Sequence, residues 1–369
     1  MKILSPLSKP DEVTPLVEAG AEEFYAGVLD TAWRKKYTNV GSINRREWSV
    51  SNLESYDDLD RVVRTAHKLG AKVYPPMNAL YSAHQYESLN RNLEEMRKIP
   101  VDALIVADPG LLLTLKETGW DREIHISTGC TTFNHRTALF YSEFGATRIV
   151  IPRHQNITEM VRLAKSIDFM EKECFIFNSG CKNIDGFCTY HHGANEILHK
   201  GSYKLPKKLG LDYAFLKTLR RLPQCMAKKI ARFCNLKSDS ACLLNYKVTP
   251  HILKDWTPAQ AGKAKKWLES TFNIYSGLDP CGVCAIPDLV EAGLVSIKIV
   301  GRENPTYKKV MDVKFLRRML DLWEKNDMSR TEYKQEAKKA YKEVYDAPCQ
   351  EWCYYPETSF ERTLSGKDR

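Results

Sequence analysis

The chain has 369 residues and is 43% hydrophobic, which is enough apolar sequence for a large buried core. No apolar run reaches membrane-spanning length, and Pro6, Pro10 and Asp11 come too early for a signal peptide, so we expect a cytoplasmic protein. The missing signal and the odd count of 11 cysteines argue against a secreted disulfide framework.

Short β-branched runs alternate with helical patterns along the chain. Strands are expected at Lys2–Leu4, Glu23–Ala26, Lys72–Tyr74, Ala103–Ala107, Ile124–Ser127, Arg148–Ile151, Cys174–Phe177 and Ser296–Val300. Several of these runs are almost wholly apolar, as parallel strands buried on both faces require. Asp57–Leu69 predicts a helix that buries Leu59, Val62, Val63, Ala66 and Leu69 on one face and ends at Gly70.

These repeats predict an α/β fold, specifically a (β/α)8 TIM-like barrel over residues 1–303. Residues 189–270 form a long basic insertion before the last strand, expected to be mostly helical, and residues 304–369 form a helical C-terminal extension. No Gly-x-Gly-x-x-Gly follows the first strand, so a dinucleotide-binding open sheet has no support.

Polar residues follow many of the predicted strands. They are Asn78, Asp108, Thr128, Arg153, Asn178 and Arg302. Each alone is explained as a cap or turn residue, but in a barrel all of them would meet at the active-site face, which favours a site.

The basic insertion carries eleven Lys and Arg against the single acid Asp212 between Lys200 and Lys237. A solvated charged surface is the ordinary explanation. The alternatives are an RNA or phosphate contact, or charge balance for an anionic cluster.

The cysteines form a second pattern. Cys181 and Cys188 make a C-x6-C pair after the seventh strand, Cys225, Cys234 and Cys242 lie in the insertion, and Cys281 and Cys284 precede the eighth strand. Thiolates suit zinc or iron–sulfur clusters, and the spacing alone does not separate the two. Cys174 lies in an apolar strand, so we expect it to be core.

The chain resembles the collagenase-like peptidase family of unassigned catalytic type (U-32). The resemblance is carried, in order, by Leu16–Tyr25, Lys72-Val-Tyr74 with Asn78, Ile105–Gly110, His125–Thr128 with Asn134, Ile151-Pro-Arg153, Gly180-Cys181 with Cys188, Pro287–Gly293 and Lys298–Arg302. Some members of this family are oxygen-independent hydroxylases that act in ubiquinone biosynthesis or on tRNA and ribosomal RNA bases.

The resemblance implies a [4Fe–4S] cluster. By that similarity its ligands would be Cys181, Cys188, Cys281 and a cysteine of the insertion, either Cys242 or Cys234. The chain departs from the family where His154 follows Pro152-Arg153 in place of an acid, and in the length of the loop after Cys188. Roles for Cys284, Cys349 and Cys353 stay open.

The first hypothesis for function is an oxygen-independent hydroxylase acting on a small molecule. Arg153 and Arg302 would hold a carboxylated oxygen donor such as prephenate, and Asn78, Asp108 and His154 would orient substrate or move protons. The alternatives are an RNA-base hydroxylase that uses the basic insertion, a peptidase, and a non-catalytic iron–sulfur subunit; a homo- or heterodimer is also open.

For a peptidase, Cys130 lies near His125 and His135 in the sequence, so a Cys–His pair is conceivable. No His-Glu-x-x-His zinc motif is present. We expect His125 to pack in the barrel core. The peptidase hypothesis is then left without an identifiable set of catalytic residues.

Overall fold

A computed structural model gives the fold of the chain. It describes residues 1–28, 31–37, 43–46, 51–178, 256–262, 280–325, 327–349 and 353–359. Most of the predicted insertion at 189–270 therefore lies outside the described residues.

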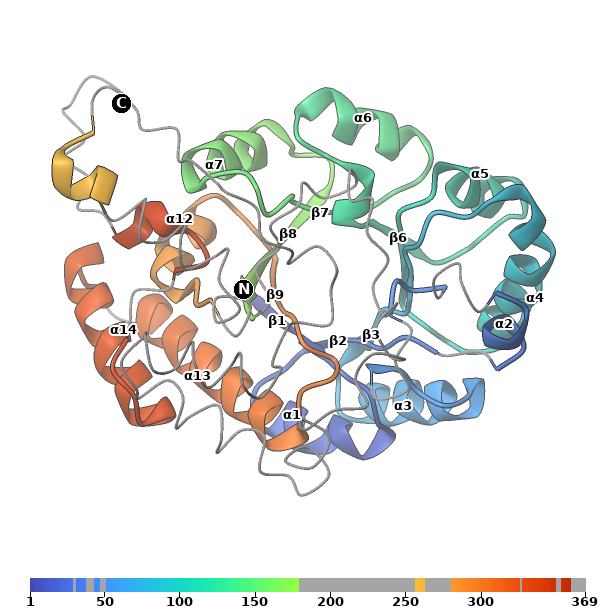
Figure 1. Cartoon of the computed structure of the whole chain (residues 1–369), viewed down its shortest axis with the longest axis horizontal. Helices are drawn as coiled ribbons and strands as arrows, with labels where there is room; N and C mark the ends of the chain where they lie inside the picture. Colours follow the sequence, from blue (N-terminus) through green and yellow to red (C-terminus); the bar gives the residue numbers. More distant parts are fainter. Residues whose placement is uncertain are drawn as a thin grey trace, which may run out of the picture.

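The sheet is parallel throughout its described pairings and strongly curled (Figure 1). Its strands are β1 (Lys2–Pro6), β2 (Glu23–Tyr25), β3 (Lys72–Val73), β4 (Pro76–Met77), β5 (Ala103–Val106), β6 (Glu123–Ile126), β7 (Arg148–Val150), β8 (Glu171–Phe177) and β9 (Ser296–Ile299). The strand order is β3-β2-β1-β9-β8-β7-β6-β5-β4. The predicted α/β class is confirmed.

The expectation of eight strands is wrong in one detail. The predicted strand Lys72–Tyr74 corresponds to β3, and an unpredicted short strand, β4, follows it after Tyr74 and Pro75. Proline has no amide hydrogen to give to a ladder, which breaks the strand there. The two segments form the two ends of the sheet although they are almost continuous in the chain.

Helices cover the outside of the curled sheet (Figure 1). They are α1 (Val13–Glu18), α2 (Thr31–Lys36), α3 (Tyr56–Lys68), α4 (Tyr86–Arg97), α5 (Pro109–Glu117), α6 (His135–Glu143), α7 (Ile157–Ser166), α12 (Ile286–Glu291), α13 (Thr306–Lys325) and α14 (Arg330–Tyr345).

Helix α3 shows how closely local sequence determines an element. The hydroxyl of Ser55 accepts a hydrogen bond from the Asp58 amide at 3.1 Å and caps the first turn. Gly70 adopts a positive φ of 78° just past the end of the helix, a conformation that glycine tolerates. The predicted buried face is confirmed except at Leu69, which lies at the C-cap and is exposed.

The two faces of the sheet differ in chemistry. The outer face packs against the helices as the main apolar core, whereas the inner face holds a small apolar cluster of Leu4, Tyr25, Tyr74, Ala103 and Ile105. Because side chains alternate along a strand, this places Glu23 on the same face as Tyr25. The inside of the sheet is therefore partly polar.

Candidate active site

Five side chains on the carboxyl-terminal side of the sheet form a cation–aromatic row. Arg302 lies 5.9 Å from the ring centre of Tyr25, and Lys298 lies 4.4 Å from the same ring. Lys298 also lies 5.7 Å from the ring centre of Phe175, and Arg153 lies 4.8 Å from it. The structure thus links the two predicted arginines through Tyr25, Lys298 and Phe175, none of which was predicted as a site residue.

Arg302 is the most enclosed cation of this row at 4% exposed. Its Nη2 donates to Asn44 Oδ1 at 3.0 Å and to the Asn44 carbonyl at 3.4 Å, and its Nη1 donates to Asn52 Oδ1 at 3.2 Å. Within the described residues, no ion pair joins it to a carboxylate. Burial lowers the pKa of the Arg302 guanidinium to about 10, which still leaves it charged near neutral pH.

Gly27 makes room for this guanidinium. A Cβ at position 27 would stand 2.1 Å from Arg302 Nη1, 2.4 Å from Asn44 Nδ2 and 2.6 Å from Asn52 Oδ1. Any side chain there would displace the arginine or its two amide partners. Gly27, Asn44 and Asn52 escape prediction from sequence because they are far from Arg302 in the chain.

Lys298 connects the row to a buried charge network. Its ammonium lies 3.2 Å from Glu173 Oε1, and Arg148 lies 3.4 Å from Glu173 Oε2 and 3.0 Å from Glu23. Burial lowers the pKa of Lys298, and the charge of Glu173 opposes this shift. Burial alone would raise the pKa of Glu23, but hydrogen bonds and charge from Arg148 outweigh it and lower that pKa.

Further hydrogen bonds hold the carboxylate of Glu23 in this buried charge network. Ser296 Oγ donates to Glu23 Oε2 at 2.7 Å, and the Tyr74 hydroxyl donates to Glu23 Oε1 at 2.9 Å. Buried charges are tolerated when they are paired and hydrogen-bonded in this way. The sequence gives one indication of Lys298, because it begins the segment Lys298–Arg302 that resembles the family. This indication is weak, since lysine side chains are seldom buried.

Asn78 follows β4 and lies beside Ser127, to whose hydroxyl its Nδ2 donates at 3.3 Å. Its Oδ1 is buried and has no hydrogen-bond partner among the described residues. An acceptor of this kind is costly to bury unless a donor reaches it. Asn78 is therefore a candidate to bind a donor on a substrate.

Both carboxylate oxygens of Asp108 accept hydrogen bonds from nearby residues. Its Oδ1 accepts from the Leu111 amide at 2.8 Å and from the Tyr86 hydroxyl at 2.7 Å, and its Oδ2 accepts from the Tyr81 amide at 3.0 Å. The first bond caps α5. No described contact joins Asp108 to the cation–aromatic row, so its predicted catalytic role stays a prediction.

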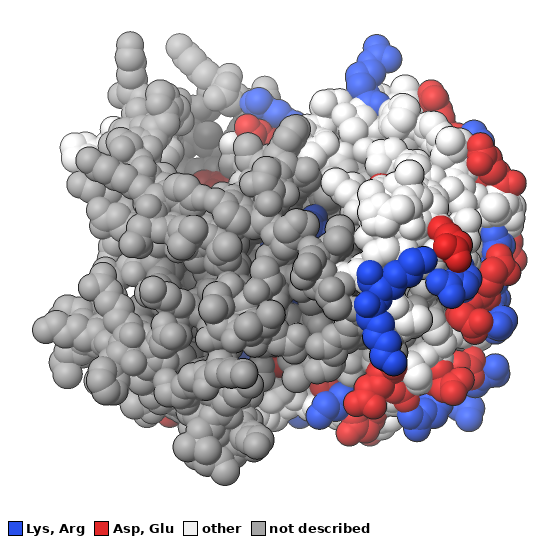
Figure 2. All heavy atoms as spheres, turned by 45° about the vertical axis from the view of Figure 1, so that its right-hand side comes forward, with Lys and Arg blue, Asp and Glu red and all other residues white. Residues whose placement is uncertain are grey.

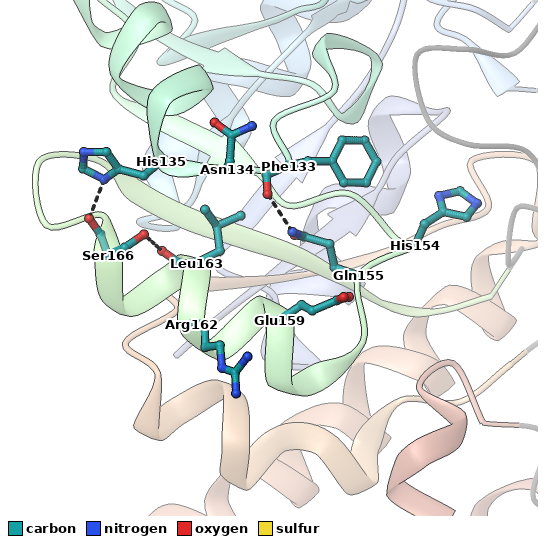
Figure 3. A pocket seen from close by; sticks show the side chains of 9 residues that line it. All are labelled: Phe133, Asn134, His135, His154, Gln155, Glu159, Arg162, Leu163 and Ser166. Carbon is teal, nitrogen blue, oxygen red and sulfur yellow. Dashed lines mark hydrogen bonds between the residues drawn. The ribbon is translucent and has the colours of Figure 1, made fainter. Parts of the chain in front are cut away.

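His154 is exposed and lines an open cavity of about 550 Å³ between the start of α6 and helix α7. Figure 3 shows His154 and His135 at opposite sides of this cavity, with Gln155 between them. Gln155 Nε2 donates to the Phe133 carbonyl at 2.9 Å, and its buried Oε1 has no partner in the part of the chain that is described. His154 follows Arg153 directly in the chain, but no residue of the cation–aromatic row lines this cavity.

The Cys–His pair considered for a peptidase does not form among the described residues. The Cys130 thiol donates to the Ala107 carbonyl at 3.1 Å, and burial raises the pKa of this thiol to about 12. A thiol that stays protonated is a poor nucleophile. His125 instead lies 3.1 Å from Glu123, and His135 contacts the Ser166 carbonyl at 2.7 Å.

Of the predicted cluster ligands, only Cys281 is described; Cys181, Cys188, Cys234 and Cys242 lie outside the described residues. Cys281 forms a bridge with Phe177 at the carboxyl end of β8. Cys353 is a second bridge partner of Cys281, so two thiol-bearing segments meet at this edge. No group of three potential ligands already stands ready to hold a metal ion in the described ranges.

Comparison with known proteins shows the family. The sequence profile of Peptidase family U32 matches residues 8–197 and 226–363, and the chain belongs to this family. The resemblance inferred from the sequence segments is therefore confirmed.

Individual relatives are RNA-modification proteins by name. The chain is 29% identical over 166 residues to tRNA hydroxylation protein P2 of Bacillus subtilis, covering 45% of this chain and 48% of that protein. It is 26% identical over 187 residues to tRNA hydroxylation protein P of Escherichia coli, covering 51% and 38%. It is 31% identical over 139 residues to the 23S rRNA 5-hydroxycytidine C2501 synthase of Escherichia coli, covering 37% and 20%.

The chain thus spans less than half the length of these relatives. A solved U32 peptidase aligns at a TM-score of 0.37 and 19% identity over 48% of this chain and 70% of that one, too low to carry an argument. Within the described residues, no helix is both long and apolar enough to cross a membrane.

Proposed function

We propose that this protein is an oxygen-independent hydroxylase that acts on an RNA base and uses an iron–sulfur cluster. From the sequence alone a small-molecule substrate comes first, but the names of the relatives favour the RNA alternative. The observation that carries the chemistry is Arg302, a buried cation whose described partners are neutral amide oxygens. A buried cation without an anionic partner is a favourable place for an anionic group.

The side chains of the row have separate roles in this proposal. Arg302 binds one carboxylate of the oxygen donor, and Arg153 orients it from the far end of the row. Lys298, held by Glu173, keeps a positive charge beneath the bound anion. Asn78 Oδ1 accepts a hydrogen bond from an amino or imino group of the base. His154 follows Arg153 in the chain, and its imidazole can accept or return a proton.

A bound cluster would supply electrons and an iron site that activates an oxygen-bearing group. By family resemblance its ligands are Cys181, Cys188, Cys281 and either Cys242 or Cys234. Cys281, the one described member of this set, supports the proposal because it pairs with Phe177 at the carboxyl end of β8 and with Cys353.

We also propose that the sheet closes into a (β/α)8 barrel. The end strands β3 and β4 are consecutive, and segment 72–77 contacts both neighbours. The Tyr74 amide donates to the Phe24 carbonyl at 2.8 Å on one side, and the Asp102 amide donates to the Val73 carbonyl at 3.1 Å on the other. Closure would bring the ends of all strands to one face.

The substrate class can be tested with RNA from a strain that lacks this gene. Anaerobic, cluster-loaded protein is incubated with bulk tRNA or ribosomal RNA and a carboxylated oxygen donor, and the digested nucleosides are compared by mass spectrometry. We expect one nucleoside to gain one oxygen atom only when the cluster is present. Unchanged RNA together with hydroxylation of a small aromatic acceptor would restore the small-molecule hypothesis.

A further inference from the structure

Asn178, one of the polar strand-end residues noted in the sequence, connects the sheet to the C-terminal extension. It is 1% exposed, and its φ of 63° lies in the left-handed region, which asparagine adopts more readily than most residues that have a Cβ. Its Nδ2 donates to the Val300 carbonyl at 3.1 Å and to Asp312 Oδ2 at 2.9 Å. One side-chain amide at the end of β8 therefore joins the end of β9 to helix α13.

Asp312 is fully buried and is held from the other side by two residues of the extension. Lys308 Nζ donates to both of its carboxylate oxygens at 2.6 Å, and the Tyr345 hydroxyl donates to Oδ1 at 2.7 Å. Lys308 Nζ also lies 3.4 Å from Asn178 Oδ1. A buried carboxylate that is paired and hydrogen-bonded in this way keeps one position. We call Asn178, Lys308, Asp312 and Tyr345 the extension cluster.

The extension cluster spans the turn that carries Arg302, which lies between β9 and α13. At the start of this turn, the Val300 amide donates to the Phe177 carbonyl at 3.0 Å, and the Val300 carbonyl accepts from Asn178. Beyond the turn, Asp312 lies on α13 and accepts from the same asparagine. The two ends of the turn are therefore tied to each other and to β8.

We propose that Asn178 and Asp312 are positioning residues, which hold this turn and so place the Arg302 guanidinium for an anionic group. A side chain that recognises a carboxylate must be held within a fraction of an ångström, which requires support behind it. Asn44 and Asn52 hold the guanidinium itself, whereas the extension cluster holds the backbone that carries it. This inference rests on the proposed role of Arg302 in binding the oxygen donor.

Two buried tyrosines of α14 offer a matched comparison. The Tyr345 hydroxyl donates to Asp312, whereas the Tyr333 hydroxyl donates to the carbonyls of Val283 at 3.2 Å and Met319 at 3.3 Å. Phenylalanine at either position removes one buried hydroxyl from the same helix and keeps the ring. A general loss of stability should therefore affect both variants, and a positioning role only Tyr345→Phe.

The test measures the dissociation constant of prephenate, used as the anionic probe, by calorimetry on the anaerobic, cluster-loaded full chain. Asn178→Gly tolerates the left-handed backbone but removes the amide, so it should raise this constant about tenfold. Tyr345→Phe should raise it about threefold, and Tyr333→Phe should leave it unchanged. The affinity for bulk tRNA should keep its wild-type value in all three variants, since phosphate contacts dominate it.

Hydrogen–deuterium exchange of the backbone amides of residues 300–305 is a second measurement, which needs no ligand. This segment should exchange faster in Asn178→Gly and Tyr345→Phe than in the wild type, because its anchors are weakened. Tyr333→Phe should exchange as the wild type does. Tyr345→Phe, which keeps the buried ring, decides the question if Asn178→Gly does not fold.

Wild-type prephenate binding in Asn178→Gly and Tyr345→Phe, together with lost binding in Arg302→Ala, would overturn the inference and leave the donor site intact. Equal losses in Tyr345→Phe and Tyr333→Phe would also overturn it. If Arg302→Ala binds prephenate as the wild type does, or the wild type does not bind it, the proposed donor role fails. Exchange at residues 300–305 then decides alone: faster exchange in the two variants supports the positioning role, and unchanged exchange refutes it.

Discussion

At the scale of single residues, Arg302 carries most of the proposed chemistry. Its guanidinium is enclosed by Gly27, Asn44 and Asn52, so it is held in place before any substrate arrives. Its selection as a site residue followed from its position just past the eighth predicted strand. Its partners are not, because they depend on long-range contacts that a single sequence does not reveal.

Arg302→Ala should abolish binding of the anionic donor. Truncating one partner of a buried charge pair costs about 2–5 kcal/mol, so kcat/KM should fall by about 30-fold or more. Arg302→Lys should recover only part, because an ammonium cannot donate in bidentate fashion. The exposed Arg64→Ala is the control. A large fall in unfolding temperature with unchanged donor binding would assign Arg302 to structure instead.

Gly27→Ala should also weaken donor binding, although it removes no polar group. The added methyl would overlap Arg302, and overpacking of this kind costs about 1–3 kcal/mol of stability. Donor binding should weaken because the guanidinium is displaced. In an Arg302→Ala background, Gly27→Ala should lower the free energy of unfolding by less. A double-mutant cycle of the wild type, the two single variants and the double variant measures this difference. Additive costs would mean that position 27 does not act through Arg302.

At the scale of elements, helix α13 is fastened to the start of the chain by a buried ion pair. Lys309 Nζ lies 2.9 Å from Glu12, and the Ser8 amide and the Thr306 hydroxyl donate further hydrogen bonds to this carboxylate. Breaking such a pair on one side leaves an unpaired buried charge. The contact explains how a segment beyond β9 becomes part of the fold.

Lys309→Ala should therefore lower the free energy of unfolding by about 3–5 kcal/mol. The double variant Lys309→Met with Glu12→Gln should recover much of that stability, because no net charge remains buried. Arg318→Ala, which breaks the exposed pair with Glu343, should cost less than about 1 kcal/mol. Chemical denaturation of the metal-free proteins gives the comparison, and equal costs for the two single changes would contradict it.

Strand β6 carries a pH-dependent element. Burial lowers the pKa of His125 below its ordinary 6.5, against the opposing hydrogen bond to Glu123, and Arg148 lowers it further. The folded protein keeps this imidazole neutral while the unfolded chain protonates it below pH 6.5, so unfolding binds a proton there. Acidification through this window should therefore reduce stability by up to about 1.4 kcal/mol per pH unit.

His125→Gln should reduce the change in the free energy of unfolding between about pH 7 and pH 5. Carboxylates titrate mainly below this range, so they contribute less to the change than histidine does. His84→Gln, at an exposed position, should leave the slope unchanged. Urea unfolding at several pH values measures both. A profile of the same slope in His125→Gln would show that other groups produce the acid sensitivity.

The elements also show how far sequence could predict the fold. The buried face of α3 and the core position of Cys174 followed from local periodicity and are confirmed. The break between β3 and β4, the exposure of Leu69 and the charges inside the sheet did not follow, because each depends on tertiary pairing. Glu23, Arg148 and Glu173 are tolerated there only as a network.

At the scale of the whole molecule, the sequence contains one strongly basic stretch, whereas the visible described surface carries charges of both signs side by side (Figure 2). Figure 2 shows Lys and Arg side chains among Asp and Glu side chains over the described part of one face. The eleven basic residues between Lys200 and Lys237 lie outside the described residues. If RNA is the substrate, this stretch is the strongest candidate in the sequence to contact phosphates.

Affinity for tRNA should then fall steeply with salt. Removing one phosphate-binding side chain should reduce the slope of log affinity against log salt by about 0.7–0.9. Lys207→Ala and Lys208→Ala together should lower the slope, whereas Lys98→Ala, exposed at the end of α4, should not. Fluorescence anisotropy with labelled tRNA gives these slopes, and equal slopes for all variants would exclude the insertion from phosphate binding.

The proposed reaction transfers oxygen from a carboxylated donor to RNA without O₂. The most direct measurement supplies an isotopically labelled donor to anaerobic, cluster-loaded protein with tRNA or ribosomal RNA and follows the label by nucleoside mass spectrometry. We predict labelled hydroxynucleoside with wild-type protein, and none with cluster-free protein or Arg302→Ala. Peptide cleavage by cluster-free protein, or hydroxylation that requires O₂ and carries no donor label, would contradict the account.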